Sequence, residues 1–264
     1  MKTTIYQVDA FAECPFSGNP AGVCLLREAA NEEWMQNVAM EMNVAETAFA
    51  VRRADGDFDL RWFTPTIEVE LCGHATLATS HILWETETLK AGETARYHTR
   101  SGPLAAAQHD GRVQLDFPAN PPHPVDPPPG LLEALGVKAA YVGQTRFDYL
   151  VEAGSEAVLR SIAPDFRRLR QLGIRGVIVT APSDDPAFDF VSRFFAPGAG
   201  IDEDPVTGSA HCALAPYWAK RFDRAEMTGF QASKRGGVVR VVLDGERVKL
   251  AGHAVTVLRG ELKT

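Results

Sequence analysis

Several features that mark common protein classes are missing from this 264-residue sequence. Its few cysteines form no CxxC pair, so the spacing predicts neither a disulfide framework nor a metal site, and reduced thiols are typical of a cytoplasmic protein. No apolar run approaches the roughly 20 residues that cross a bilayer, so no membrane association is predicted. The cysteines are Cys14, Cys24, Cys72 and Cys212.

Positive charge is also scarce. The sequence has 27 Lys and Arg against 34 Asp and Glu, a net charge of −7. This balance argues against nucleic-acid binding, which depends on basic surfaces. There is no GxGxxG motif and no P-loop, so the sequence predicts no dinucleotide or nucleoside triphosphate cofactor.

Strand and helix patterns are both present, without the steady alternation of a parallel sheet. This order predicts an α+β fold with mostly antiparallel sheets. Asn31 is expected to cap a helix over residues 32–42, and the stretches 46–51 and 58–63 are expected to form a hairpin. Residues 118–129 are rich in proline and are predicted to link two lobes.

We therefore expect an N-terminal lobe over residues 1–120 and a C-terminal lobe over residues 121–264. The last predicted strand, near 254–264, is a candidate to return to the first lobe.

One pattern occurs twice. Phe63-Thr-Pro65 followed by Gly73-His-Ala75 matches Phe195-Ala-Pro197 followed by Gly208-Ser-Ala210. We call residues 63–78 the first repeat and residues 195–213 the second repeat. Each repeat predicts a strand, a loop and the start of an Ala-rich helix, so the two lobes are expected to be built alike. If the lobes face each other, both helix starts can point into one cleft, where their free N–H groups suit a carboxylate. Chance similarity of short motifs is the alternative.

The second repeat has three adjacent acids, Asp202, Glu203 and Asp204, beside a Gly-rich helix start. Acids next to an anion-binding turn suggest that at least one takes part in chemistry. The alternative is a solvated acidic loop in which Asp204 or Ser209 caps the helix.

Three residues of the first half are candidates for proton transfer. Glu46 starts a strand among apolar neighbours, where a desolvated carboxylate has a raised pKa and can exchange a proton near neutral pH. Cys72 and His74 lie at the predicted helix start, where a thiolate is favoured and the imidazole is expected to be neutral. The alternatives are an exposed glutamate, a buried apolar cysteine and a histidine that only donates a structural hydrogen bond, as we expect for His211.

Together these stretches resemble the PhzF family of phenazine-biosynthesis-like isomerases, which are relatives of diaminopimelate epimerase. The resemblance covers nearly the whole chain and rests on Val8-Asp-Ala-Phe11, Gly18-Asn-Pro-Ala-Gly22, Ala45-Glu-Thr-Ala-Phe49, Cys72-Gly-His-Ala-Thr76 and Glu203-Asp-Pro-Val-Thr-Gly-Ser-Ala210.

The resemblance implies two similar lobes, each a curled and mainly antiparallel sheet around a central helix, with the active site between them. It implies cofactor-free proton transfer without a metal, on a small carboxylate substrate, in a homodimer. The residues that match the family's catalytic positions are Glu46, which would shuttle the proton, with His74 and Asp204. Substrate binding is expected from Asn19, Cys72, Gly73, Gly208 and Ser209.

The sequence departs from the epimerase relatives at one position. They use two cysteines on opposite faces of the substrate carbon, whereas here Cys72 matches the first and Asp204-Pro205 takes the place of the second. We therefore expect an isomerase. Two alternatives stay open, an epimerase or racemase that pairs Cys72 with Asp204 or Glu46, and a small-molecule binder without activity. The sequence does not name the substrate.

Overall fold

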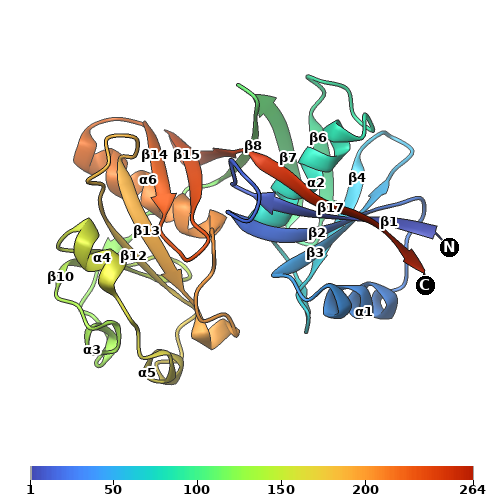
Figure 1. The fold of residues 1–264 in the computed structure, drawn as a ribbon. Helices are drawn as coiled ribbons and strands as arrows, with labels where there is room; N and C mark the ends of the chain where they lie inside the picture. The colour runs from blue at the N-terminus through green and yellow to red at the C-terminus, as the bar shows by residue number, and fades with distance from the viewer. Residues whose placement is uncertain (1, 264) are drawn as a thin grey trace. The chain divides into compact units, whose positions relative to one another are not determined.

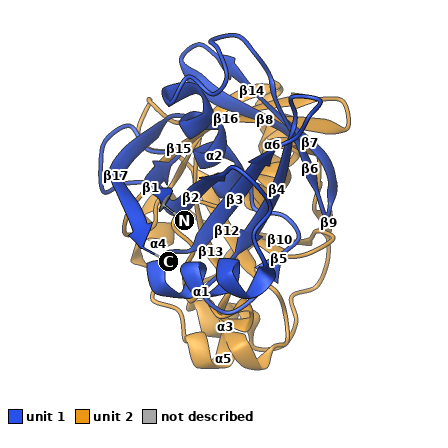
Figure 2. Cartoon of the chain, turned by 90° about the vertical axis from the view of Figure 1, so that its right-hand side faces the viewer, with its two compact units in different colours: residues 1–116, 251–264 blue, residues 117–250 orange. Residues whose placement is uncertain are grey.

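The computed structural model describes residues 2–263, which divide into two compact units (Figure 1, Figure 2). Unit 1 comprises residues 1–116 and 251–264, and unit 2 comprises residues 117–250. The last strand therefore belongs to the same unit as the first, and antiparallel pairing joins them, with Ile5 opposite Gly260.

Unit 1 holds most of the chain's longer strands and two helices. Its elements are β1 (Lys2–Ala10), β2 (Asn19–Leu26), α1 (Glu32–Met42), β3 (Glu46–Arg52), β4 (Phe58–Phe63), β5 (Glu68–Val69), α2 (Gly73–Glu85), β6 (Ala95–Thr99), β7 (Gly102–His109) and β17 (Ala254–Lys263). The boundaries between the units fall within β8 (Arg112–Pro118) and β16 (Arg247–Gly252).

Antiparallel pairs dominate unit 1. Strand β1 lies between β17 and β2, and β3 pairs with β4. Parallel pairs join β2 to β3 and β4 to β6. Helix α2 packs on β1, β2, β3 and β17 and is buried on nearly every side. Its polar side chains are tolerated there because Thr76, Thr79 and Ser80 each donate to the carbonyl four residues earlier.

Helix α1 shows how the local sequence sets the element before the candidate site. Asn31 Oδ1 accepts the Trp34 N–H at 2.7 Å, which confirms the predicted N-cap. The helix ends at Asn43, which adopts the left-handed conformation with φ 50° and lets the chain turn into β3. As a result, Glu46 is the first residue of its strand.

Unit 2 is built from the same kinds of element. They are β9 (His123–Pro124), α3 (Leu131–Leu135), β10 (Ala139–Gln144), β11 (Tyr149–Ala153), α4 (Glu156–Ser161), α5 (Phe166–Gln171), β12 (Val177–Pro182), β13 (Phe190–Phe195), the 3₁₀ helix η1 (Pro197–Ala199), α6 (Gly208–Phe222), β14 (Glu226–Gln231) and β15 (Gly237–Asp244). Strands β11 and β12 are parallel, β12 and β13 antiparallel, β13 and β14 parallel, and β14 and β15 antiparallel.

Helix α6 is the buried helix of unit 2, as α2 is of unit 1. Trp218 stacks on Phe190 and on Phe222, with ring centroids 6.1 Å and 4.9 Å away. Pro216 lies inside the helix and cannot donate to the Cys212 carbonyl, which instead accepts the Asn120 N–H at 3.0 Å. The break in the helix ladder thus anchors the proline-rich segment.

The predicted fold class is confirmed. Antiparallel pairs outnumber parallel ones in each unit, and each sheet packs against a central helix. The two repeats occupy corresponding places, since each runs from the end of a strand (β4 or β13) to the start of the buried helix (α2 or α6). Among residues 2–263, no helix is both long and apolar enough to span a membrane.

Candidate active site

Glu46 lies where three features of unit 1 meet. It begins β3, pairs in register with Ala21 of the parallel strand β2, and follows the turn after α1. Asn19, which is fully buried, lies two residues before Ala21 and therefore on the same face of the sheet as Glu46. The exposed fraction of the Glu46 side chain is only 13%, so its carboxylate is not a surface group.

Cys72 and His74 lie beside this carboxylate at the start of α2. His74 Nε2 is 3.1 Å from Glu46 Oε2, and Cys72 Sγ is 3.6 Å from His74 Nδ1. The Nε2–Oε2 distance is that of an ion pair, although the His74 ring is not aligned for a linear hydrogen bond to this oxygen.

The ionisation states of these three side chains are set by one another. Burial acts to raise the pKa of Glu46, but the charge of His74 outweighs it, so this pKa lies below the usual value of 4.5. Burial acts to lower the pKa of His74, but Cys72 and Glu46 outweigh it and hold this pKa well above 6.5. Burial, reinforced by Glu46, raises the pKa of Cys72 to about 11. Near neutral pH the group is a carboxylate, an imidazolium and a thiol.

Three expectations from the sequence are therefore corrected. The pKa of Glu46 is lowered and not raised, His74 is charged and not neutral, and Cys72 keeps its proton despite its place at a helix start. The reason is the same for all three. A buried carboxylate 3.1 Å from an imidazole favours the ion pair over two neutral groups, and its negative charge opposes a second one on the sulfur.

The ion pair makes a testable contribution to stability. The Glu46 pKa is depressed, so its contribution is present above about 4.5 and is lost as the pH falls through the folded-state pKa. The His74 pKa is raised, so its contribution is complete below about 6.5 and is lost as the pH rises through the folded-state pKa. Glu46→Gln should therefore lower the free energy of unfolding most between these two values, by about 1–3 kcal/mol.

Urea unfolding of the parent and the Glu46→Gln variant across the pH range measures this difference directly, because the remaining titrating groups are common to both proteins. A difference that does not vary with pH would show that the two side chains are not ion-paired.

In unit 2, the loop before α6 is fixed around Asp204. Thr207 Oγ1 donates to the Asp204 carboxylate. Gln231 is fully buried at the end of β14, where it donates to the Asp204 carbonyl at 2.7 Å and accepts the Thr207 N–H at 2.9 Å. The Asp204 N–H in turn donates to the Phe194 carbonyl at 3.0 Å. Asp204 is therefore held at several points and does not lie in a free acidic loop.

The other two acids of this loop have structural partners. Glu203 receives two hydrogen bonds from the Arg193 guanidinium, at 2.7 and 2.9 Å. Asp202 pairs with Arg170 at 3.3 Å. Of the three adjacent acids, these two stabilise the loop, and only Asp204 remains a candidate for chemistry.

The two helix starts share a geometry that the repeats predicted. Gly73 begins α2 and Gly208 begins α6, and neither N-cap residue, Cys72 or Thr207, forms a side-chain capping bond. The first N–H groups of both helices are thus left to other acceptors. Behind them, Thr76 donates to the Cys72 carbonyl at 2.6 Å, and His211 Nδ1 donates to the Thr207 carbonyl at 2.9 Å. His211 therefore has a structural role, as expected, and its burial lowers its pKa to about 4.

The structure thus forms two groups from the predicted residues. Unit 1 brings Glu46, Cys72 and His74 together, and unit 2 brings Asp204 to the start of α6, where Gly208 and Ser209 lie. The predicted cleft between the lobes stays a prediction. Sequence reasoning missed Gln231, because it belongs to no motif and its hydrogen bonds reach residues 24 and 27 positions away.

Comparison with known proteins identifies the family of this chain. The PhzC-PhzF family, described as phenazine biosynthesis-like protein, matches residues 8–260. The chain belongs to the PhzC-PhzF family. This confirms the resemblance found in the sequence. A member named uncharacterized isomerase, from Halalkalibacterium halodurans, is 49% identical over 263 residues, which cover 99% of each chain.

Solved structures of PhzC-PhzF members have the same fold. The crystal structure of a phenazine biosynthesis protein of the PhzF family from Enterococcus faecalis matches all of both chains with a TM-score of 0.95 and 42% identity. A hydroxyproline epimerase from Agrobacterium vitis matches with a TM-score of 0.63 and 12% identity, covering 99% of this chain and 92% of that one. The second likeness shows a shared fold alone.

The side chains of the candidate site are also close enough together to contact one metal ion. One ligand atom each from Glu46, Cys72 and His74 lies within 4.8 Å of the others. A metal would need the thiolate and the neutral imidazole, whereas the ion pair favours the thiol and the imidazolium.

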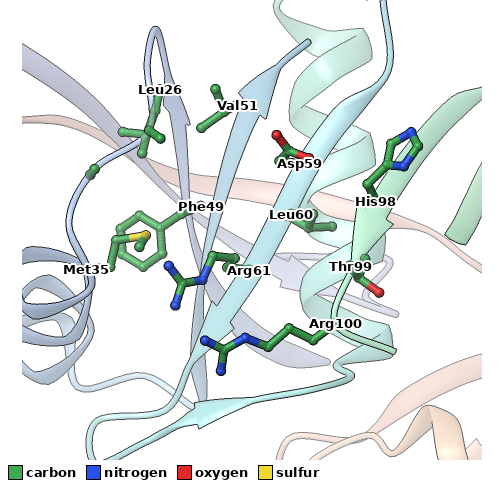
Figure 3. A pocket seen from close by; sticks show the side chains of 12 residues that line it. Leu26, Met35, Phe49, Val51, Asp59, Leu60, Arg61, His98, Thr99 and Arg100 are labelled. Atoms are coloured by element: carbon green, nitrogen blue, oxygen red, sulfur yellow. The ribbon is translucent and has the colours of Figure 1, made fainter. Parts of the chain in front are cut away.

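A separate cavity of about 400 Å³ lies elsewhere in unit 1 (Figure 3). Apolar side chains such as Phe49 and Leu60 line it, together with the guanidinium groups of Arg61 and Arg100. None of the predicted site residues lines this cavity. Both guanidinium groups pair with Glu68, and both also contact Glu32. The two positive charges are thus matched by two carboxylates.

The four cysteines, all of them free thiols, give a second prediction. Cys14 is exposed, whereas Cys24, Cys72 and Cys212 are buried, and burial raises the pKa of Cys24 to about 12. A disulfide reagent at neutral pH should therefore modify one thiol in the native protein, and Cys14→Ser should abolish this reaction. Fast modification of a second thiol, mapped to Cys72 by mass spectrometry, would contradict the raised pKa of its sulfur.

Proposed function

We propose that this protein is a cofactor-independent isomerase that moves a proton between two carbons of a small carboxylate substrate, with Glu46 as the acid–base group. The observation that supports the proposal best is the buried ion pair. Its carboxylate is ionised near neutral pH and lies 3.1 Å from the His74 imidazole. Membership of the PhzC-PhzF family and the isomerase names of close relatives support the same reaction class.

The proposed reaction has two proton transfers. Glu46 takes a proton from one carbon of the substrate, and the electron pair moves toward a conjugated oxygen. The His74 imidazolium stabilises the negative charge that develops there. The protonated Glu46 then returns the proton to a second carbon, so atoms and charge balance within one substrate molecule. We include Asp204 in the proposal as a group that orients the substrate.

A base with a lowered pKa needs help to remove a proton from carbon. The resting ion pair keeps Glu46 ionised, and a negatively charged substrate beside it would offset the charge of His74 and raise the Glu46 pKa. The base would thereby become stronger when substrate binds. A positioned acid–base group contributes a factor of about 10² to 10⁴ to the rate, and the remainder comes from positioning and exclusion of water.

The ionisation of Cys72 weighs against a thiol-based racemase. Removal of a proton from carbon by Cys72 would require its thiolate, but a pKa of about 11 leaves little thiolate near neutral pH. The family resemblance to epimerases at low identity adds only the fold.

Incubating unsaturated and hydroxylated carboxylates with the protein in D₂O tests the proposal. Isomerisation places deuterium at a carbon other than the one that loses its proton. Epimerisation places deuterium at the same carbon, the original stereocentre. Deuterium at the stereocentre with inversion would replace the isomerase by an epimerase. Binding without any exchange across the panel would leave a small-molecule binder.

A further inference from the structure

The position in unit 2 that corresponds to Glu46 holds no acid. In unit 1, Phe63 of the first repeat pairs with Thr47, the residue after Glu46. In unit 2, Phe195 of the second repeat pairs with Val177, the residue after Gly176. A Cβ on Gly176 would lie 2.4 Å from Phe194 Cζ, so a side chain at this position would require the Phe194 ring to move. Unit 2 therefore has no second copy of the base at this position.

A buried acid and an arginine lie there instead. Asp148 Oδ1 is 3.1 Å from where the Gly176 Cβ would stand. The Asp148 side chain is only 1% exposed, and it accepts hydrogen bonds from both Nε (2.8 Å) and Nη2 of Arg175. The Arg175 side chain itself is 43% exposed. A buried carboxylate that holds a half-exposed guanidinium in a bidentate pair fixes the direction of that guanidinium.

The turn that precedes β11 holds Asp148 in place. Thr145 Oγ1, which is buried, accepts the N–H groups of Phe147 at 3.1 Å and Asp148 at 2.9 Å. The rings of Phe147 and Phe194 flank the Arg175 guanidinium, with centroids 5.3 Å and 5.7 Å from its central carbon. The guanidinium is therefore oriented by two oxygens and two rings.

The oriented guanidinium meets the start of α6. Arg175 Nη2 donates to Ser209 Oγ at 3.3 Å. Ser209 is the second residue of α6, as His74 is of α2. A cation beside the N-terminus of a helix is repelled by the positive end of the helix dipole. A negative charge close to both the cation and the N-terminus removes this repulsion. Asp148 supplies one such charge on the buried side, and Nη1 of Arg175 has no hydrogen-bond partner among residues 2–263.

We propose that Arg175, together with Ser209, binds a carboxylate group of the substrate and selects for acidic substrates. The two units are thus chemically different at corresponding positions: unit 1 has the acid–base group, and unit 2 has a fixed cation. A planar guanidinium with a free edge suits a planar carboxylate. This inference rests on the proposed function, because it takes the bound carboxylate to be part of a substrate. The binding of a carboxylate can nevertheless be measured without turnover.

Titration of benzoate and of its uncharged analogue benzamide, followed by ligand-observed NMR, tests the inference. Arg175→Gln should weaken benzoate binding by about tenfold or more and leave benzamide binding unchanged. Because Asp148 would then be buried without its partner, the double variant Asp148→Asn/Arg175→Gln provides the same test without an unpaired buried charge.

Arg146→Gln is the matched control. Arg146 is exposed, lies over the same Phe147 ring with its central carbon 5.0 Å from the centroid, and makes no contact with Ser209. Its loss removes an equal charge from beside the same ring and should change benzoate binding by less than about twofold, because solvent screens exposed charges. Equal losses in the Arg146 and Arg175 variants, or a parent protein that binds benzoate no better than benzamide, would overturn the inference.

Glu46→Gln separates this inference from the proposed function. Both hold if this variant binds benzoate as the parent does and loses deuterium exchange. If the parent shows Arg175-dependent benzoate binding but no exchange on any carboxylate, the isomerase proposal fails and the anion site stands. If exchange proceeds and its rate is the same in the Arg175 variants, the assignment of Arg175 fails and the isomerase stands.

Discussion

Replacing Glu46 with glutamine is expected to lower the rate of deuterium incorporation into substrate by a factor of about 10² to 10⁴. Glutamine keeps nearly the same size and still accepts a hydrogen bond, but it cannot take a proton from carbon at neutral pH. The loss should appear in kcat, because the group acts in the transition state and not in substrate binding. The measurement is the rate of label uptake, followed by NMR in D₂O at neutral pH.

Glu68→Gln is the matched control for this variant. The Glu68 side chain is also buried in unit 1, with 6% exposed, and it pairs with Arg61 and Arg100. Its replacement removes a buried carboxylate without touching His74 and should leave the exchange rate within about threefold, as expected for a change in stability alone. An equal loss in both variants would mean that Glu46 supports the fold and does not act on substrate.

Replacing Phe195 with alanine is expected to have the largest effect on stability, about 3–5 kcal/mol. Phe195 is fully buried in the core of unit 2, where its ring contacts Phe166 at a centroid distance of 6.1 Å and lies under the Arg193 guanidinium at 4.8 Å. Removing the ring leaves a cavity and also exposes the ion pair between Arg193 and Glu203 to water. Urea unfolding followed by tryptophan fluorescence measures the loss.

Phe147→Ala is the comparison, since the Phe147 side chain is 50% exposed in the same unit. It should cost no more than about 0.5 kcal/mol. If the two units unfold in separate transitions, only the transition of unit 2 should shift in the Phe195 variant. Similar midpoints for the two variants would show that the ring of the second repeat is not a core residue.

Local sequence was enough to predict the features that depend on short segments. The cap at Asn31, the pairing of β3 with β4, and the two repeats that each lead into a buried helix follow from turn chemistry and spacing. The grouping of Glu46 with Cys72 and His74 came from the family resemblance, because nothing in a 26-residue separation predicts a contact.

Other properties of the site could not be predicted, for two physical reasons. Ionisation depends on distances between groups, so a rule based on helix position assigned the wrong charge to His74 and a lowered pKa to Cys72. Long-range hydrogen bonds leave no local pattern, so Gln231 and the pair of Asp148 with Arg175 were missed. Aligning the strand registers of the two repeats does lead to Arg175, because Gly176 is then the residue of unit 2 that corresponds to Glu46.

The central claim is that Glu46 transfers one hydrogen between two carbons of the same molecule. The most direct test uses a substrate labelled with deuterium at the carbon that loses its proton, converted in ordinary water. The account predicts that part of the label appears at the accepting carbon of the product, because the deuteron on a buried carboxylate is returned before it fully exchanges with solvent. It also predicts no such product from Glu46→Gln. Formation of the labelled product by that variant at the parental rate would contradict the account.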